Sequence, residues 1–280
     1  MPMTNYVISL SSARERRQHV MNEFSKHHVP FQFFDAVSPS SQLDFLIQRL
    51  VPNLNGTSLT GGEKGCLISH LALWHKCIQD NLPYIAIFED DILLGRDART
   101  FLAEDEWLFS RFNCDDIFII RLETFLQETI CEELPNPVSY CGRDFLSLKD
   151  EHLGTAGYII SLGAAKYLLE IFKNMESNNI FPIDHLIFNR FLAGEELMVY
   201  QLSPALCIQE LQLNENESLL DSQLESERKN YRLAEKARKK KTWREKVYHI
   251  FTKPQRMLKK RKERAEKNAK MKLKCIVKFE

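Results

Sequence analysis

The sequence lacks any apolar run that approaches the 18 or more residues of a membrane-spanning helix. It also lacks the pattern of a secretory leader, because the first apolar run is short and its basic residues follow it instead of preceding it. The seven cysteines are odd in number and irregularly spaced, and they form no CxxC pair. We therefore expect a cytoplasmic protein with reduced thiols, and these spacings disfavour a zinc site.

No net charge remains, since 38 Lys and Arg balance 38 Asp and Glu, but the charges are unevenly distributed. Residues 228–274 hold 21 basic residues against four acids, whereas residues 1–227 hold 16 against 33. An apolar content of 44% and a charged content of 27% are typical of a globular protein. The sequence predicts an acidic domain over residues 1–221 and a basic C-terminal tail over residues 222–280.

Short apolar stretches alternate with helical patterns within the acidic domain. The stretches are rich in β-branched or aromatic residues and lack polar alternation, as in strands buried on both faces. They fall at residues 6–10, 31–36, 84–88, 117–121, 157–161 and 197–202, with helical patterns at residues 13–28, 63–80, 163–175 and 184–193. This alternation predicts an α/β domain with a mostly parallel central sheet.

Three adjacent carboxylates, Glu89, Asp90 and Asp91, directly follow the apolar run YIAIF. In open α/β sheets, ligands bind beyond the carboxyl ends of the strands. Adjacent carboxylates repel one another, and a hard cation with oxygen ligands, Mg²⁺ or Mn²⁺, would offset that repulsion and attract phosphate. The run predicts a metal site, with a solvated acidic turn as the alternative.

Six blocks of sequence follow one another along the chain: NYVISLSSARERRQHVMNEFSKHHVPFQFFDAV, GGEKGCLISHLALWHKCI, YIAIFEDDILLG, IFIIRLETFL, GTAGYIISLGAAKYLLE and PIDHLIFN. Together they resemble glycosyltransferase family 25, and within it the bacterial lipooligosaccharide galactosyltransferases of the Haemophilus and Pasteurella type. The resemblance covers nearly all of residues 4–217. Six ordered blocks are far more specific than any one motif.

The resemblance implies a GT-A fold, which is a nucleotide-sugar-binding α/β sandwich with a divalent metal. It implies transfer of a hexose, usually galactose from UDP-galactose, with inversion to a β-linkage on a lipooligosaccharide core sugar. UDP-glucose remains an alternative donor, since the two sugars differ at one hydroxyl.

The resemblance also assigns roles to the acidic residues. Glu89-Asp90-Asp91 is similar to the acidic motif of the family, which makes Asp91 the expected metal ligand and lets Asp90 or Glu89 contact ribose, or reach the metal through water. Gln209 lies late in the domain, where GT-A enzymes often supply a further metal ligand. That ligand is commonly His, which this stretch lacks.

Inverting transfer needs a base that takes a proton from the acceptor hydroxyl. Asp184 follows Pro182 at a predicted helix start, and it matches an acidic position of the family. We expect it to be the base, with helix capping as the alternative, because Asp is a common N-cap.

Donor contacts are expected from the first two blocks. Ser9 and Leu10 end the first strand, at an edge that holds uridine in the family, and Arg14 or Arg17 would neutralise a phosphate, with Arg14 favoured. The second block adds three candidates for donor contact, Glu63, Ser69 and His70. A capping box with Thr60 is the alternative for Glu63, and a packed core histidine is the alternative for His70.

The last donor-site candidates flank two later strands. Arg121 and Glu123 end one strand, where they either pair with each other or bind the sugar. Thr155 and Gly157 lie in a run of small residues that lets backbone approach a ligand or forms a tight turn.

The basic tail is suited to anionic surfaces. Trp243, Val247, Ile250 and Phe251 share one helical face beside the Lys and Arg residues, which predicts docking on the inner face of the inner membrane. A solvated tail is the alternative. Two other classes, a nucleic-acid-binding protein and a metal-dependent phosphohydrolase, leave the six blocks unexplained, and no nucleic acid is expected as a partner.

Overall fold

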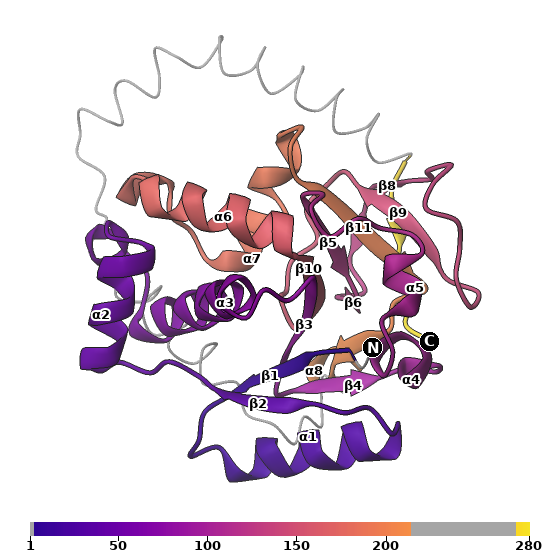
Figure 1. The fold of residues 1–280 in the computed structure, drawn as a ribbon, viewed down its shortest axis with the longest axis horizontal. Coiled ribbons are helices and arrows are strands. Elements are labelled where there is room, and N and C mark those ends of the chain that lie inside the picture. The colour runs from indigo at the N-terminus through magenta and orange to yellow at the C-terminus, as the bar shows by residue number, and fades with distance from the viewer. Residues whose placement is uncertain (1–2, 214–272) are drawn as a thin grey trace, which may run out of the picture. The chain divides into compact units, whose positions relative to one another are not determined.

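A central eight-stranded sheet organises the structure, a computed structural model that describes residues 3–213 and 273–280 (Figure 1). Its order is β2-β1-β3-β10-β5-β11-β9-β8. The strands are β1 (Asn5–Ser9), β2 (Gln32–Asp35), β3 (Tyr84–Glu89), β5 (Phe118–Arg121), β8 (Cys131–Glu132), β9 (Asp144–Leu148), β10 (Gly157–Ser161) and β11 (Met198–Ser203).

Most strands of this sheet point in one direction, and β10 and β9 run opposite to them. β1 runs parallel to both β2 and β3, and β5 runs parallel to β11, while β10 is antiparallel to its neighbours β3 and β5. The carboxyl ends of β1, β3, β5 and β11 therefore meet the start of β10 along one edge, which we call the carboxyl edge. The predicted α/β fold with a mostly parallel central sheet is confirmed.

Helices cover both faces of the sheet (Figure 1). The side chains of β3 explain why both faces are buried, since Ile85 and Ile87 pack into one hydrophobic core and Ala86 and Phe88 into the other. The first core includes α2 (Ser41–Leu50), α3 (Gly61–Gln79), α6 (Leu162–Asn174) and α7 (Ile183–Ile187), and the second includes α1 (Arg14–Lys26), α4 (Ala98–Leu102) and α5 (Glu106–Phe109).

Side-chain caps fix where the longer helices begin. Thr60 and Glu63 form a complete capping box at the start of α3, despite the two glycines between them. Ser40 and Ser161 accept backbone N–H bonds at the starts of α2 and α6. The predicted helix over residues 184–193 is divided, because Asn189 is not helical and separates α7 from η3 (Arg190–Ala193).

A smaller sheet, in the order β4-β12-β6, continues from the ends of the central strands. It consists of β4 (Ile92–Leu94), β12 (Cys207–Gln209) and β6 (Glu123–Thr124). The remaining elements are η1 (Leu54–Gly56), η2 (Ser177–Asn179), β7 (Glu128–Thr129), α8 (Glu210–Leu213) and β13 (Cys275–Ile276).

The chain divides into two compact units, residues 1–221 with 276–280, and residues 222–275. The sequence placed residues 276–280 with the basic tail, whereas the structure packs them into the first unit. Val277 is buried there, its carbonyl accepts a hydrogen bond from Thr124, and the backbones of Ala205 and Lys278 are hydrogen-bonded. Arg143 adds a bond to the carbonyl of Glu280.

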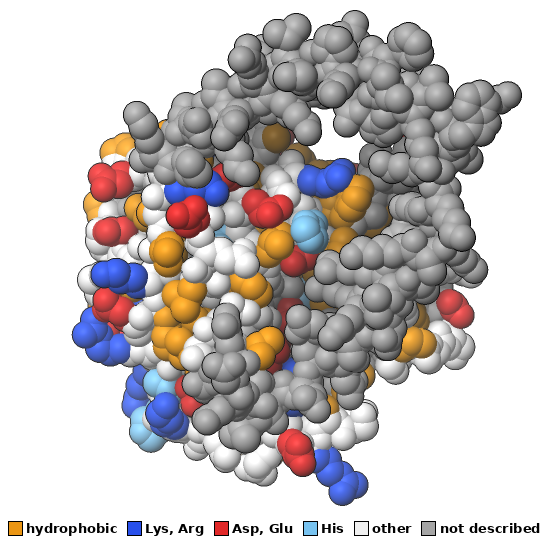
Figure 2. All heavy atoms as spheres, turned by 180° about the vertical axis from the view of Figure 1, so that it is seen from behind, with side chains coloured by type: hydrophobic (Ala, Val, Ile, Leu, Met, Phe, Trp, Pro, Cys, Tyr) orange, Lys and Arg blue, Asp and Glu red, His pale blue; other side chains and the backbone are white. Residues whose placement is uncertain are grey.

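None of the helices in the described ranges is both long and apolar enough to cross a membrane. Acidic, basic and apolar side chains are interspersed over the described part of the face in Figure 2. The residues that carry the predicted membrane anchor lie outside the described residues.

Close packing between the sheets leaves no room for a side chain at Gly157. A Cβ on Gly157 would lie 2.2 Å from Sγ of Cys207 and 3.4 Å from the ring of Phe88. Gly157→Ala is therefore expected to lower the free energy of unfolding by about 1–3 kcal/mol, measured by denaturant titration.

The control for this change is Gly194→Ala, whose added Cβ meets only a carbonyl at 3.4 Å and should cost little. The double variant Gly157→Ala, Cys207→Ala should lose less free energy of unfolding than the two single variants lose together, because the sulfur is the atom that clashes. Strict additivity would contradict the clash.

Candidate active site

The three consecutive acids lie at the carboxyl edge, where β3 ends and the chain turns into β4. Their side chains are largely buried, with exposed fractions of 23% for Glu89, 11% for Asp90 and 18% for Asp91. Nη1 of Arg16, on α1, lies 2.5 Å from Oδ1 of Asp90 and 3.5 Å from Oδ2 of Asp91. One guanidinium thus offsets part of the repulsion between the carboxylates.

Asp91 remains under-compensated. Burial, together with the charges of Glu89 and Asp90, raises its pKa to about 7, and Arg16 only partly opposes this rise. Its Oδ1 is buried and has no hydrogen-bond partner within the described residues. An oxygen of this kind has the charge and the open coordination that a hard divalent cation requires.

Glu89 has the opposite electrostatic environment. Although burial would raise its pKa, His70, Thr155 and Arg16 together hold that pKa below its usual value. Oγ1 of Thr155 donates to Oε1 of Glu89 at 2.7 Å, and Nε2 of His70 lies 3.6 Å from the same oxygen. The pKa values of these two neighbouring carboxyl groups are thus shifted in opposite directions, downward for Glu89 and upward for Asp91.

The three donor candidates on α3 have structural partners. Both Glu63 and Ser69 bond to backbone, Glu63 in the capping box, and Ser69 by donating to the carbonyl of Gly65 and accepting from the amide of Val37. His70 is fully buried and contacts Tyr158 OH through Nδ1 at 2.8 Å. Of the three, only His70 reaches the acidic cluster.

The first strand ends close to a different arginine from the one we favoured. Arg17 donates to the carbonyls of Ser9 and Leu10 and pairs with Asp35, so it ties β1 to β2. Arg14 is exposed, and it is Arg16 that contacts the acids. All three arginines lie on α1, and their spacing in the sequence did not identify which of them faces the carboxyl edge.

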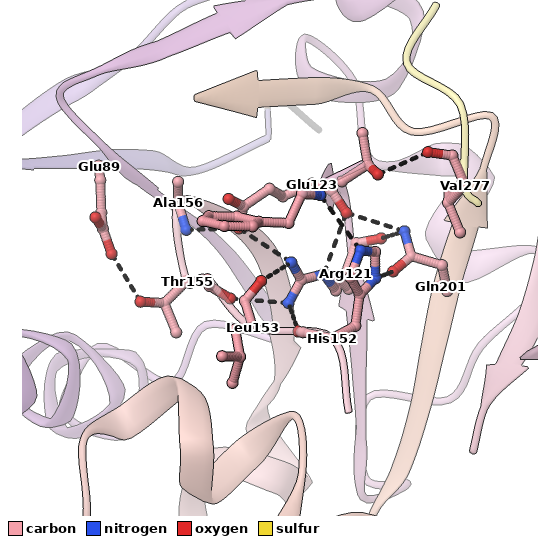
Figure 3. A network of polar contacts seen from close by, with 12 residues as sticks. Glu89, Arg121, Glu123, His152, Leu153, Thr155, Ala156, Gln201 and Val277 are labelled. Atoms are coloured by element: carbon pink, nitrogen blue, oxygen red, sulfur yellow. Dashed lines mark hydrogen bonds and ion pairs between the residues drawn. The ribbon is translucent and has the colours of Figure 1, made fainter. Parts of the chain in front are cut away.

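Arg121 is fully buried and organises the middle of the carboxyl edge (Figure 3). Its guanidinium donates to the carbonyls of His152, Leu153 and Gly154 and lies 3.5 Å from Oε2 of Glu123. It also lies 4.5 Å from the ring centre of Phe188. The loop that precedes β10 is therefore folded around this arginine, and the predicted Arg121–Glu123 pair is formed.

Glu123 has a raised pKa. Burial raises it to about 8, with Arg121 opposing and Glu89 adding to the rise. Its Oε2 accepts from the amide of Ala156, while its Oε1 is buried without a partner in the described part of the chain. A Cβ on Gly154, which has φ of +97°, would meet this carboxylate at 2.7 Å.

Two residues that the sequence analysis did not single out complete this network. Burial lowers the pKa of His152 to about 3, and its Nδ1 lies 3.1 Å from Oε1 of Gln201. Gln201 also donates to the carbonyl of Glu123 (Figure 3). Gln201 lies within β11 in register with Arg121, which is a long-range pairing that no local pattern reveals.

Thr155 and Gly157 have distinct roles at the start of β10. Thr155 positions Glu89, whereas Gly157 is required by packing, and its carbonyl accepts from the amide of Leu122. The tight-turn alternative applies to Gly154, whose φ is positive.

Asp184 lies in the first turn of α7, and the N-cap position is Pro182. Its Oδ1 accepts the amide of the next residue, His185, so it does not form the predicted N-cap bond. Its charge acts on Arg121, and α7 ends at Phe188, whose ring contacts that guanidinium. Asp184 thus belongs to the surroundings of the carboxyl edge.

Gln209 and Asp91 are brought together from distant parts of the sequence. β12 pairs with β4 so that Gln209 lies opposite Ile92, and the amide of Glu210 donates to the carbonyl of Asp91 at 2.8 Å. The predicted metal ligands therefore lie near each other, Asp91 in the turn before β4 and Gln209 at the end of β12, the strand paired with β4.

A cavity of about 340 Å³ lies away from these groups. Its walls include Phe118 and Met198, which are paired at the amino ends of β5 and β11. The cavity thus lies at the edge opposite the carboxylates, and the buried charges locate the candidate site more directly.

The sequence of this chain is similar to those of known proteins. A family model described as glycosyltransferase family 25 (LPS biosynthesis protein) matches residues 3–187. The chain is a glycosyltransferase. It belongs to glycosyltransferase family 25.

Relatives match over most of their lengths. The lipooligosaccharide biosynthesis protein lic2B of Haemophilus influenzae is 46% identical over 91% of this chain and 93% of its own. The lipooligosaccharide biosynthesis protein lex-1 of Haemophilus influenzae is 42% identical over 98% of both chains. The lacto-N-neotetraose biosynthesis glycosyltransferase LgtB of Neisseria meningitidis is 43% identical over 94% of this chain and 98% of its own.

The buried Glu123 predicts a pH-dependent stability. Between pH about 4.5 and about 8 this carboxyl holds its proton in the fold but loses it in the unfolded chain, so raising the pH through that window lowers the free energy of unfolding. Glu123→Gln cannot ionise, and denaturant titrations across this range should show a shallower decline than in the unaltered protein.

The matched control is Glu104→Gln, which removes an exposed carboxylate and should leave the decline unchanged. If the free energy of unfolding of Glu123→Gln falls with pH as steeply as that of the unaltered protein, the buried carboxyl is not the source of the pH dependence.

Proposed function

We propose that this chain transfers a hexose, galactose from UDP-galactose, to a sugar of a lipooligosaccharide acceptor with inversion to a β-linkage. The observation that carries the proposal is Asp91, which holds a buried and unpartnered oxygen at the carboxyl end of β3 in a family 25 chain. The names of the relatives, which refer to lipooligosaccharide and lacto-N-neotetraose biosynthesis, support the acceptor class.

The residues at the carboxyl edge fit a divalent cation, Mn²⁺ or Mg²⁺. Asp91 would hold it, and Gln209, at the end of the strand paired with β4, would supply a further oxygen. When bound, such an ion stabilises the negative charge of a departing diphosphate. It would also relieve the burial cost that raises the pKa of Asp91.

The side chains around this position bind and orient the substrates. Arg16 places a positive charge beside Asp90 and Asp91, where it would attract a diphosphate. Glu89, held by Thr155, is an ionised acceptor for donor hydroxyls. Asp184 would take the proton from the acceptor hydroxyl as that oxygen attacks the sugar.

Arg121 acts through the backbone. Because it binds the carbonyls of residues 152–154, it fixes the loop that carries Thr155 to Glu89. The buried guanidinium of Arg121 thus keeps the donor site rigid, and it does so without contacting the sugar.

Docking of the basic segment on an anionic membrane surface stays a prediction from the sequence. It would bring the enzyme to a lipid-linked acceptor at the inner face of the inner membrane. The composition of residues 228–274, with 21 basic residues against four acids, supports it.

The first experiment measures UDP release from a panel of UDP-sugars, with Mn²⁺ or with a chelator. We expect Mn²⁺-dependent release from UDP-galactose, and Asp91→Asn should lower it by about 100-fold or more, because a cation at a developing charge contributes several kcal/mol. UDP binding in the presence of Mn²⁺ should weaken in the same variant.

Asp80→Asn is the control, since Asp80 is a surface carboxylate paired with Lys76, and it should behave as the unaltered protein. Preference for UDP-glucose would change the donor and leave the site in place. Full activity of Asp91→Asn would contradict the metal assignment, and failure to bind UDP with Mn²⁺ would contradict the nucleotide-sugar site.

A second variant tests the base. Asp184→Asn keeps the shape of the side chain but cannot accept a proton, so transfer should fall by about 10²–10⁴-fold while Mn²⁺-dependent UDP binding is retained. Initial rates and equilibrium binding of UDP measure the two effects separately.

Asp150→Asn is the matched control, because Asp150 also accepts the amide of its next residue. Its transfer rate should be unchanged. An equal loss of transfer rate in Asp184→Asn and Asp150→Asn would assign Asp184 a structural role and exclude it as the base.

A further inference from the structure

A second group of potential metal ligands lies beside the acidic triplet. Cys66 and His70 are one turn apart on α3, and both face Glu89 at the end of β3. The ligand atoms of the three side chains all lie within 4.8 Å of one another. The local sequence disfavoured zinc because it lacks CxxC pairs, but the fold supplies the third group from another strand.

His70 is held with one nitrogen directed at this group. Its side chain is fully buried, and Nδ1 lies 2.8 Å from Tyr158 OH, which also accepts from Nε1 of Trp74. The other nitrogen, Nε2, is buried and has no hydrogen-bond partner within the described residues. A metal-binding histidine is oriented in this way, with its second nitrogen fixed by an outer partner.

The separation of His70 and Glu89 suits an ion better than a direct hydrogen bond. Nε2 lies 3.6 Å from Oε1 of Glu89, which is longer than a good N–H···O bond. Two ligands that are each 2.0–2.1 Å from a tetrahedral Zn²⁺ lie about 3.4 Å from each other. A small movement of either side chain would therefore place both at coordination distance.

We propose that Cys66, His70 and Glu89 bind a thiophilic divalent cation, Zn²⁺, at a site distinct from the oxygen-ligand site of Asp91. Thiolate and imidazole favour Zn²⁺, whereas Mn²⁺ and Mg²⁺ favour carboxylate and phosphate oxygens, so the ligand types separate the two cations. On binding, the Cys66 thiol gives its proton to solvent and its sulfur coordinates the ion. The fourth position of the tetrahedron is open to water.

The surroundings of the ligands support this assignment. Thr155 donates to Oε1 of Glu89, as outer partners of metal-bound carboxylates do. Cys66 is only half-buried, which gives an ion a path of entry. Glu89 belongs both to this Zn²⁺ site and to the proposed donor site, so a bound Zn²⁺ would prevent Glu89 from contacting the donor. This last consequence alone rests on the proposed function.

The test uses Co²⁺ as a spectroscopic probe on the full-length protein. We expect a thiolate-to-cobalt charge-transfer absorption that Zn²⁺ abolishes by displacement, and Cys66→Ser should eliminate it. Zn²⁺ affinity, measured by competition with a chromophoric chelator, should fall in Cys66→Ser by more than the ~100-fold that loss of an outer partner can cause.

Two controls make the result specific. Cys114→Ser changes another half-buried thiol, beside the start of α6, and Asp91→Asn removes the proposed Mn²⁺ ligand; both should keep the absorption. Glu89→Gln should weaken Zn²⁺ binding, so the proposal does not depend on one variant. Absence of the absorption from the unaltered protein, or its persistence in folded Cys66→Ser, would overturn the proposal.

Discussion

Compensation of buried negative charge is the constraint on which the carboxyl edge depends. Burying an unpaired carboxylate is costly, so acids converge there only because guanidinium groups lie beside them. Arg16 serves the acids that follow β3, and Arg121 serves Glu123 while binding three backbone carbonyls. Compensation is incomplete at two oxygens, which belong to Asp91 and Glu123. Both oxygens lie where the strands end. Burying them without a partner among the described residues lowers the folding stability at the edge of the sheet where we expect the chemistry.

The central sheet and the acidic triplet could be predicted because their signals are local. Doubly buried strands need continuous apolar runs, and a run such as YIAIF that ends in acids places those acids at a sheet edge. The contacts between residues of different strands could not be predicted in this way, because they depend on the register between distant segments. Gln201 meets Arg121, and Gln209 lies beside the strand that follows Asp91, only after the sheet has formed.

Helical faces set a second limit on prediction. Arg14 and Arg16 differ by 200° around α1, and the sequence did not show which face meets the sheet. The same limit applied to α3, where Glu63 and Ser69 bond to backbone while His70 extends to Glu89. The division of the predicted helix at Asn189 follows from its backbone conformation, which the apolar spacing around it did not signal.

The return of residues 276–280 to the first unit changes the topology of the chain. The basic segment is joined at both of its ends to one folded unit, so it is an insertion and not a free extension. Joining the two ends of an inserted segment has an entropy cost that grows only logarithmically, about 0.6 kcal/mol for each doubling of its length. The length and the charge of this segment could therefore change at a small entropy cost to the first unit, provided that the contacts around Val277 remain.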